Sequence, residues 1–93
     1  MTIHERFEQF EGEFLKFDRV KNKRSKRPDL HAFIVLDELF PDTRDMVSGA
    51  EHDEIFLSVD LGEFHAKVSD DHILELVRCG VLVTEYKCLG MYA

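Results

Sequence analysis

Apolar residues near the N-terminus recur with the period of an α-helix. One isoleucine and four phenylalanines are spaced alternately four and three residues apart: Ile3, Phe7, Phe10, Phe14 and Phe17. This spacing places them on one stripe of a helix, which we expect over residues 3–19. Thr2 and Glu5 have the spacing of a capping box at its start. We expect the stripe to face the core, with a docking or dimer surface as the alternative.

The middle of the chain predicts a second helix, a connection and a strand. Pro28 and Asp29 suit the first turn of a helix that is expected to end before Pro41. Residues 41–53 are mostly polar and predict a long connection. Apolar and polar residues then alternate, which predicts a strand over residues 54–60.

The C-terminal third predicts one helix and two strands. Ser69 is a favourable N-cap for a helix with an apolar face, and Gly80 is placed to end that helix. Residues 81–84 and 87–92 predict two strands joined by a tight turn. The predicted element order is therefore α-α-β-α-β-β, an α+β domain whose helices pack on a small, largely antiparallel, three-stranded sheet.

Length and apolar content set the domain organisation and the compartment that we expect. The 93 residues predict one compact domain over 1–93, with a basic connector at about 20–27. The longest apolar run, Ala32–Leu36, is too short to span a membrane, and the N-terminus lacks the layout of a signal peptide. We therefore expect a cytoplasmic protein with no membrane association. In that compartment Cys79 and Cys88 are expected to be reduced thiols.

The basic residues are unevenly distributed along the chain. Half of the twelve lie within nine residues that contain no acid: Arg19, Lys21, Lys23, Arg24, Lys26 and Arg27. The other residues carry all nineteen acids, and the net charge is −7, so we expect two surfaces that prefer partners of opposite charge. The simpler interpretation of the basic segment is a solvated connector that contacts the acidic body. The alternative is a nucleic-acid-binding loop, although no aromatic residue interleaves with it to stack on bases.

Acidic residues are concentrated between positions 42 and 71. The nine members of this group are Asp42, Asp45, Glu51, Asp53, Glu54, Asp60, Glu63, Asp70 and Asp71. Such a surface usually serves solubility. Its functional interpretation is mimicry of a phosphate backbone, which would let the protein occupy the nucleic-acid-binding groove of a partner.

The chain contains no recognisable catalytic motif. Its serines and cysteines lie outside nucleophile motifs, and its five glycines are isolated, so neither a phosphate-binding loop nor a cofactor is predicted. Just before the expected strand, His52 and Glu54 are able to point to the same side and have metal-ligand character. A metal-dependent hydrolase built on these two residues, with His65 or His72 as a further ligand, is one alternative. The simpler interpretation is that these residues are the solvent-exposed beginning of the strand.

Four segments resemble short, uncharacterised proteins encoded in tailed-phage and prophage genomes: Glu13–Arg19, Arg27–Phe33, Ala50–Ile55 and Leu76–Val81. The resemblance extends over nearly the whole chain. It implies a phage accessory protein that acts in the bacterial cytoplasm, and it assigns no activity and no functional residue. Proteins of this kind commonly work by binding and diverting a host protein.

These observations favour a small, acidic, non-enzymatic protein that binds a protein partner. The partner is either a host protein or a second copy of the chain. The most specific form of this hypothesis is an inhibitor of a host defence or nucleic-acid-handling protein, because the charges are segregated. Nucleic-acid binding by the basic segment and metal-dependent hydrolysis are the two alternatives.

Overall fold

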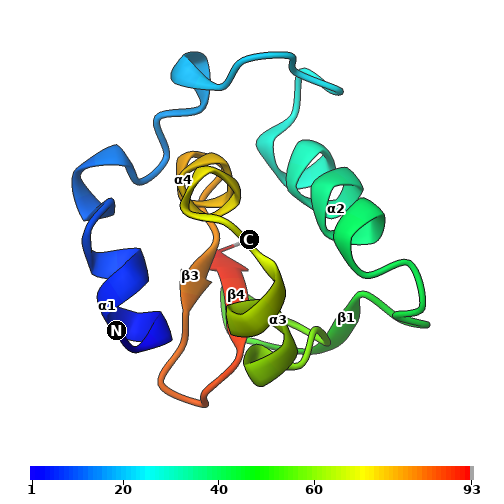
Figure 1. The fold of residues 1–93 in the computed structure, drawn as a ribbon. Coiled ribbons are helices and arrows are strands. Elements are labelled where there is room, and N and C mark those ends of the chain that lie inside the picture. The colour runs from blue at the N-terminus through cyan, green and yellow to red at the C-terminus, as the bar shows by residue number, and fades with distance from the viewer. Residues whose placement is uncertain (93) are drawn as a thin grey trace.

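Helices pack on a four-stranded antiparallel sheet in the computed structural model, which describes residues 1–92 (Figure 1). The α-helices in this range are α1 (Ile3–Glu8), α2 (Pro28–Leu39), α3 (Leu61–Lys67) and α4 (Asp70–Arg78). The strands are β1 (Val47–Glu51), β2 (Glu54–Leu57), β3 (Leu82–Val83) and β4 (Leu89–Tyr92), in the spatial order β1-β2-β4-β3. In Figure 1, α4 lies between α1 and α2 and contacts both. Within residues 1–92, no helix is long and apolar enough to cross a membrane.

The predicted mixture of helices and antiparallel strands is confirmed, and several helix ends are set as expected. At α1, the Thr2 hydroxyl accepts from the Glu5 amide at 3.2 Å, and the Glu5 carboxylate accepts from the Thr2 amide at 2.9 Å, which completes the capping box. Pro28 occupies the first position of α2. Ser69 caps α4, and Gly80 follows its end with φ +97°, a left-handed conformation that costs glycine little.

The predicted helix over residues 3–19 is wrong beyond its first two turns. Two 3₁₀ turns follow the end of α1: η1 (Glu11–Glu13) and η2 (Phe17–Arg19). Gly12 weakens a helix here by about 1 kcal/mol relative to alanine, and Leu15 adopts φ +63°. The Leu15 amide donates to the Val77 carbonyl at 3.2 Å, so a contact with α4 replaces the helical hydrogen bond. The chain therefore bends around α4 instead of continuing straight.

The sheet has four strands instead of three, and the element order contains an extra strand and an extra helix. β1 lies within the predicted connection and pairs with β2 through a turn at His52 and Asp53, where His52 has φ +56°. β1 is an exposed edge strand of small and polar residues, which lack the apolar alternation of a half-buried strand. β2 ends at Leu57 and not at Asp60, because the Asp60 carboxylate accepts from the Glu63 amide at 2.9 Å and caps α3.

The unpredicted helix α3 supplies the centre of the hydrophobic core. Phe64 is fully buried, and its ring centroid lies 6.0 Å from that of Phe7 and 6.1 Å from that of Phe40. Ile3 and Phe7 begin the N-terminal stripe and are buried as expected. The remaining members are only partly buried against the core: Phe10, Phe14 and Phe17. The break after α1 thus moves the second half of the stripe to the edge of the core.

The two faces of the sheet have different surroundings. Leu57, Leu89 and Met91 point into the core and are buried. The alternate residues point to the opposite face, because side chains alternate along a strand. On that outer face, cross-strand neighbours form two rows, the first of Gly49, Phe56, Gly90 and Leu82 and the second of Glu51, Glu54 and Tyr92.

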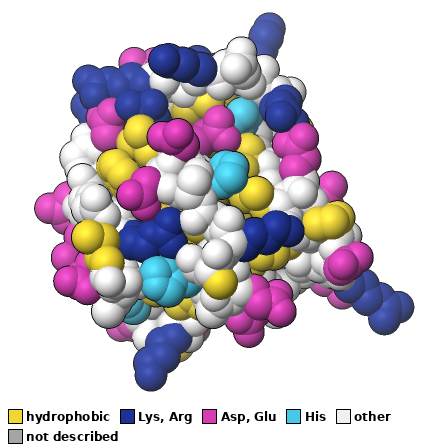
Figure 2. Space-filling view, viewed as in Figure 1, with side chains coloured by type: hydrophobic (Ala, Val, Ile, Leu, Met, Phe, Trp, Pro, Cys, Tyr) yellow, Lys and Arg dark blue, Asp and Glu magenta, His cyan; other side chains and the backbone are white. Residues whose placement is uncertain are grey.

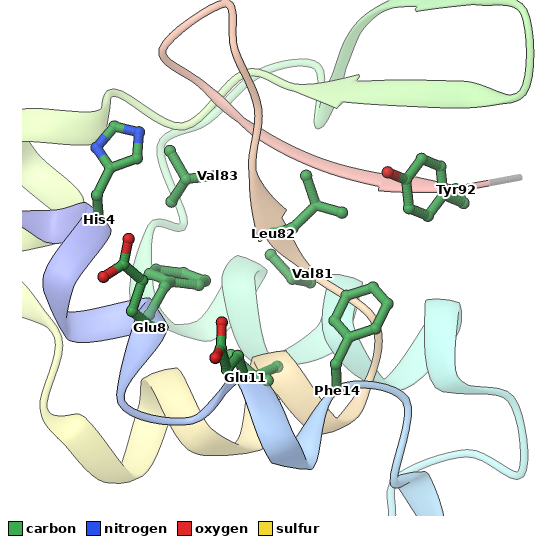
Figure 3. Close-up of a pocket in the computed structure, with 10 residues that line it drawn as sticks. His4, Glu8, Glu11, Phe14, Val81, Leu82, Val83 and Tyr92 are labelled. Atoms are coloured by element: carbon green, nitrogen blue, oxygen red, sulfur yellow. The ribbon is translucent and has the colours of Figure 1, made fainter.

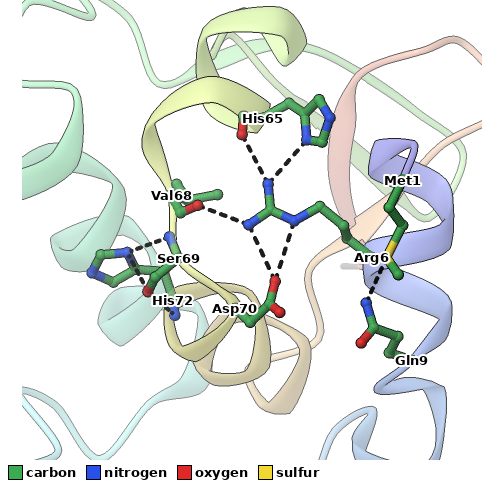
Figure 4. A network of polar contacts seen from close by, with 8 residues as sticks. All are labelled: Met1, Arg6, Gln9, His65, Val68, Ser69, Asp70 and His72. Atoms are coloured by element: carbon green, nitrogen blue, oxygen red, sulfur yellow. Dashed lines mark hydrogen bonds and ion pairs between the residues drawn. The ribbon is translucent and has the colours of Figure 1, made fainter.

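Arg6 fastens α1 to the junction between α3 and α4 (Figure 4). Its guanidinium donates to the carbonyls of His65 and Val68, each at 2.8 Å, and to the Asp70 carboxylate at 3.2 Å. A fourth contact joins the guanidinium to His65 Nδ1 at 2.9 Å, and since arginine only donates, this nitrogen accepts. The Arg6 side chain is only 13% exposed. These contacts hold α1 against the junction of α3 and α4.

Candidate functional site

The basic segment joins η2 to α2 at one edge of the molecule. Figure 2 shows Lys and Arg side chains along the edge where Figure 1 places residues 20–27, with carboxylates next to several of them. Of the six basic residues predicted as a binding surface, three contact acids of this chain. Arg19 pairs with Glu13, Arg24 with Glu38 at 2.5 Å, and Arg27 with Asp29 at 3.6 Å.

The other three basic residues have weaker partners or none within residues 1–92. The Lys23 ammonium donates to the Val20 carbonyl at 3.1 Å and lies 5.3 Å from the Phe17 ring centroid. Lys21 and Lys26 are exposed and form no ion pair in the described part of the chain. Half of the basic side chains of this segment are therefore paired with acids of the chain, and the three lysines have no ion pair within residues 1–92.

A buried histidine anchors the basic segment to the body. The Arg24 amide donates to His31 Nδ1 at 3.1 Å, and the His31 side chain is 2% exposed. Because Nδ1 accepts, the ring proton of neutral His31 lies on Nε2, which is 3.6 Å from a Glu75 carboxylate oxygen. Phe17 packs on the same ring edge to face at 5.8 Å. The basic segment is thus held to the body of the protein at Arg24, partway along its path to α2.

The proposed metal ligands do not converge. His52 lies in the β1–β2 turn with its side chain 88% exposed, and its Nε2 is 3.9 Å from a Glu51 oxygen. Glu54 lies on the outer face of the sheet. His65 is used by Arg6, and His72 bonds with Ser69 at the start of α4. Within residues 1–92 no three His, Cys, Asp or Glu side chains form a group able to hold a metal ion.

The two cysteines are free thiols in different environments. Burial, and secondarily the Glu75 carboxylate, raises the pKa of Cys79 to about 12, so that this thiol stays protonated and unreactive at neutral pH. Cys88 is half-buried, and its sulfur lies 3.2 Å from the Thr84 hydroxyl. Neither cysteine has a base poised to activate it among its hydrogen-bond partners in residues 1–92.

A groove between the N-terminal segment and the sheet edge was not predicted from the sequence (Figure 3). Its volume is about 460 Å³. The lining side chains are mostly apolar and include Phe7, Phe14, Val77, Val81, Leu82 and Val83. Its polar side chains come from α1 and η1, where His4, Glu8 and Glu11 line it, and Tyr92 closes the β4 end. The groove therefore combines an apolar floor with two carboxylates on one rim.

The break in the N-terminal helix produces this groove. Because the chain turns after Glu8, Glu11 enters η1 and Phe14 leaves the helical stripe, so both residues line the groove. The opposite wall is β3, an edge strand that pairs with β4 alone. The predicted strand over 81–84 located this wall, but no sequence pattern indicated that the broken helix would lie across the groove from it.

Comparisons with known proteins leave the function to be inferred from this geometry. The chain matches no protein-family model, no curated protein and no solved structure.

Proposed function

We propose that this chain is a small, non-enzymatic, phage-type accessory protein that binds a protein partner through the groove between α1 and β3. The observation that carries the proposal is the apolar floor of the groove together with its acidic rim. When a partner covers apolar surface that the chain leaves exposed, the complex is stabilised by roughly 25 cal/mol per Å² of that surface. Hydrophobic hollows with a few placed polar groups are the usual form of a recognition site.

The charge of the protein defines the partner. Glu8 and Glu11 lie on the rim and are exposed, and the whole chain carries a net charge of −7. A segment with apolar side chains for the floor and Lys or Arg beside them complements both features. Proteins that handle nucleic acids present such basic surfaces, which supports a host nucleic-acid-handling or defence protein in the bacterial cytoplasm as the partner.

The nucleic-acid alternative is weaker because half of the basic side chains already pair with acids of the chain. Arg19, Arg24 and Arg27 contact carboxylates of the chain, so a phosphate would have to displace them. Exposed ion pairs are weak, at roughly 0–1 kcal/mol, and neutralising Lys21, Lys23, Lys26 and Arg27 together tests this alternative. A protein that shifts DNA or RNA at low salt, and loses this binding in the neutralised variant, would replace our proposal.

A peptide selection tests the groove directly. We expect peptides selected from a random display library on the wild-type protein to combine apolar residues with Lys or Arg. Reversing the rim charges with Glu8→Lys and Glu11→Lys should weaken the selected peptides by about tenfold or more, since two attractions become two repulsions. The matched control, Asp42→Lys with Asp45→Lys, makes the same change in net charge at exposed residues away from the groove. Equal losses in both variants, or no selected peptide, would contradict the proposal.

A further inference from the structure

The outer face of the sheet places two glutamates at directly opposite positions on neighbouring strands. Glu51 of β1 and Glu54 of β2 are cross-strand partners beside the hairpin turn, and Tyr92 of β4 is the next neighbour in the row. Like charges in this position destabilise a sheet. The nearest cation, His52 in its protonated form, is almost fully exposed and lies 3.9 Å from Glu51. A cation bound between these side chains would therefore offset the unfavourable pairing.

Aromatic rings stand next to these carboxylates. Phe56 lies between two cross-strand glycines, Gly49 and Gly90, and the Thr84 methyl group and the Glu54 carboxylate reach the space that a side chain at Gly90 would fill. Tyr86, from the β3–β4 turn, packs edge to face on Phe56 at 5.4 Å and 76°. The Tyr86 side chain is 58% exposed, as is Tyr92. The rings of Tyr86 and Tyr92 are thus available to a ligand on this face.

The turn that carries Tyr86 is held in place by hydrogen bonds. Thr84 accepts from the Tyr86 amide at 3.2 Å, and its own amide donates to the Cys88 carbonyl at 2.8 Å. The negative charges of Glu51, and then of Glu85, raise the pKa of Tyr86. An aromatic ring in a fixed place with carboxylates around it is the arrangement that binds ammonium and guanidinium groups.

We propose that the outer face of the sheet, from the Glu51–Glu54 pair to the Phe56–Tyr86 pair, binds a lysine or arginine side chain of a protein partner. Charge complementarity selects this occupant, because the carboxylates attract the cation and the rings cover its alkyl or guanidinium surface. The inference deepens the proposed function and rests on it. Leu82 and Tyr92 belong both to the groove and to this face, so one partner segment is able to occupy both.

A titration followed by amide chemical shifts tests this face with a defined probe, the peptide acetyl-Gly-Arg-Gly-Arg-Gly-amide. We expect saturable shifts at Glu51, Glu54, Phe56, Tyr86 and Tyr92, with a dissociation constant on the order of 1 mM. Glu51→Gln with Glu54→Gln should weaken binding by about fivefold or more, and Tyr86→Ala should do the same. Tyr86→Phe keeps the ring and should stay within about twofold of the wild type. The control with equal charge change, Asp42→Asn with Asp45→Asn, should bind as the wild type does.

Four results would overturn the inference. They are shifts elsewhere than on this face, equal shifts with magnesium chloride, an equal loss in the Asp42 and Asp45 control, and a dimer that disappears in the Glu51 and Glu54 variant. The last result would make a second copy of the chain the occupant.

The groove variant Glu8→Lys with Glu11→Lys separates the two proposals. If groove peptides bind the wild type and the Glu51 and Glu54 variant equally, this inference fails and the proposed function stands. If the arginine peptide binds the face but no peptide binds the groove, the proposed function fails instead.

Discussion

The basic segment and the outer face of the sheet carry opposite charges, and they differ in how many of these charges have an ion-pair partner within the chain. Arg19, Arg24 and Arg27 each contact an acid of the same chain. Glu51 and Glu54 are cross-strand partners, and within residues 1–92 their one ion-pair contact is that of Glu51 with the exposed His52. Half of the most prominent charge cluster in the sequence is thus paired with acids of the chain, whereas the two glutamates of the less prominent pair have no Lys or Arg partner within residues 1–92. Clustering along the chain is a poor guide to which charges are free for a partner.

The Arg6 guanidinium has several hydrogen-bond acceptors within the chain, and we expect its removal to have the largest effect on stability. Arg6→Ala would leave the carbonyls of His65 and Val68 without their donor, at a cost to the free energy of unfolding of about 2–4 kcal/mol. Arg6→Lys should recover part of this loss, because an ammonium cannot reach all of the acceptors. Denaturant unfolding monitored by circular dichroism measures both.

A basic residue without an ion pair is the control for Arg6. Lys26→Ala removes an exposed side chain and should change stability by less than about 0.5 kcal/mol. If Arg6→Ala is equally harmless, the guanidinium contacts are not what holds α1 against the junction of α3 and α4.

His31 connects the basic segment to the core and gives the next largest effect. His31→Leu fills the buried site but leaves the Arg24 amide without an acceptor, which should cost about 1–3 kcal/mol. Hydrogen exchange at the Arg24 amide should accelerate in the same variant. His52→Leu is the matched control, since that side chain is 88% exposed and should matter little. Unchanged exchange at Arg24 would mean that the segment is anchored elsewhere.

How far the sequence predicted this fold depends on the range of the deciding interactions. Local signals predicted the caps at Thr2 and Ser69, Pro28 at the first position of α2, and the glycine that ends α4, because these depend on a few neighbouring residues. The helix over 3–19 failed because the contact between Leu15 and Val77 joins segments far apart in the sequence. α3 was missed although Asp60 and Glu63 have capping spacing, since the alternation before them favoured a longer strand.

The candidate sites were less predictable than the fold. The six basic residues were found easily, but the sequence does not reveal that three of them pair with acids of the chain. The groove needs the break after α1 and the edge position of β3, and both arise from tertiary packing. The Glu51–Glu54 pair lies in the cluster that suggested a metal site, but its cross-strand geometry depends on β1, which was predicted as a connection.

Glu13 provides a pH-dependent test of internal compensation. Its hydrogen bond with Arg78 at 2.6 Å, assisted by Arg19, holds the pKa of Glu13 below the ordinary value of 4.5. Because the folded-state pKa is the lower one, the stabilising contribution is complete above 4.5 and is lost as the pH falls through the folded-state pKa. Glu13→Gln should therefore be less stable than the wild type at pH 7, and the difference should shrink in acid. Glu8→Gln, exposed and without an ion pair in residues 1–92, should show no such convergence.

The smallest expected effect is a stabilisation, and it concerns the cross-strand pair of Glu51 and Glu54. Glu54→Gln removes one of two facing carboxylates and should stabilise the protein by about 0.2–1 kcal/mol, more at low salt than at high salt. Glu51→Gln should gain less, because it also loses the contact with His52. Thermal midpoints at two salt concentrations measure both variants. A destabilising Glu54→Gln would show that the fold itself uses this carboxylate. A stabilising one, in a variant that also loses the arginine peptide, would show that the protein keeps an unfavourable charge pair at the position where its partner supplies the cation.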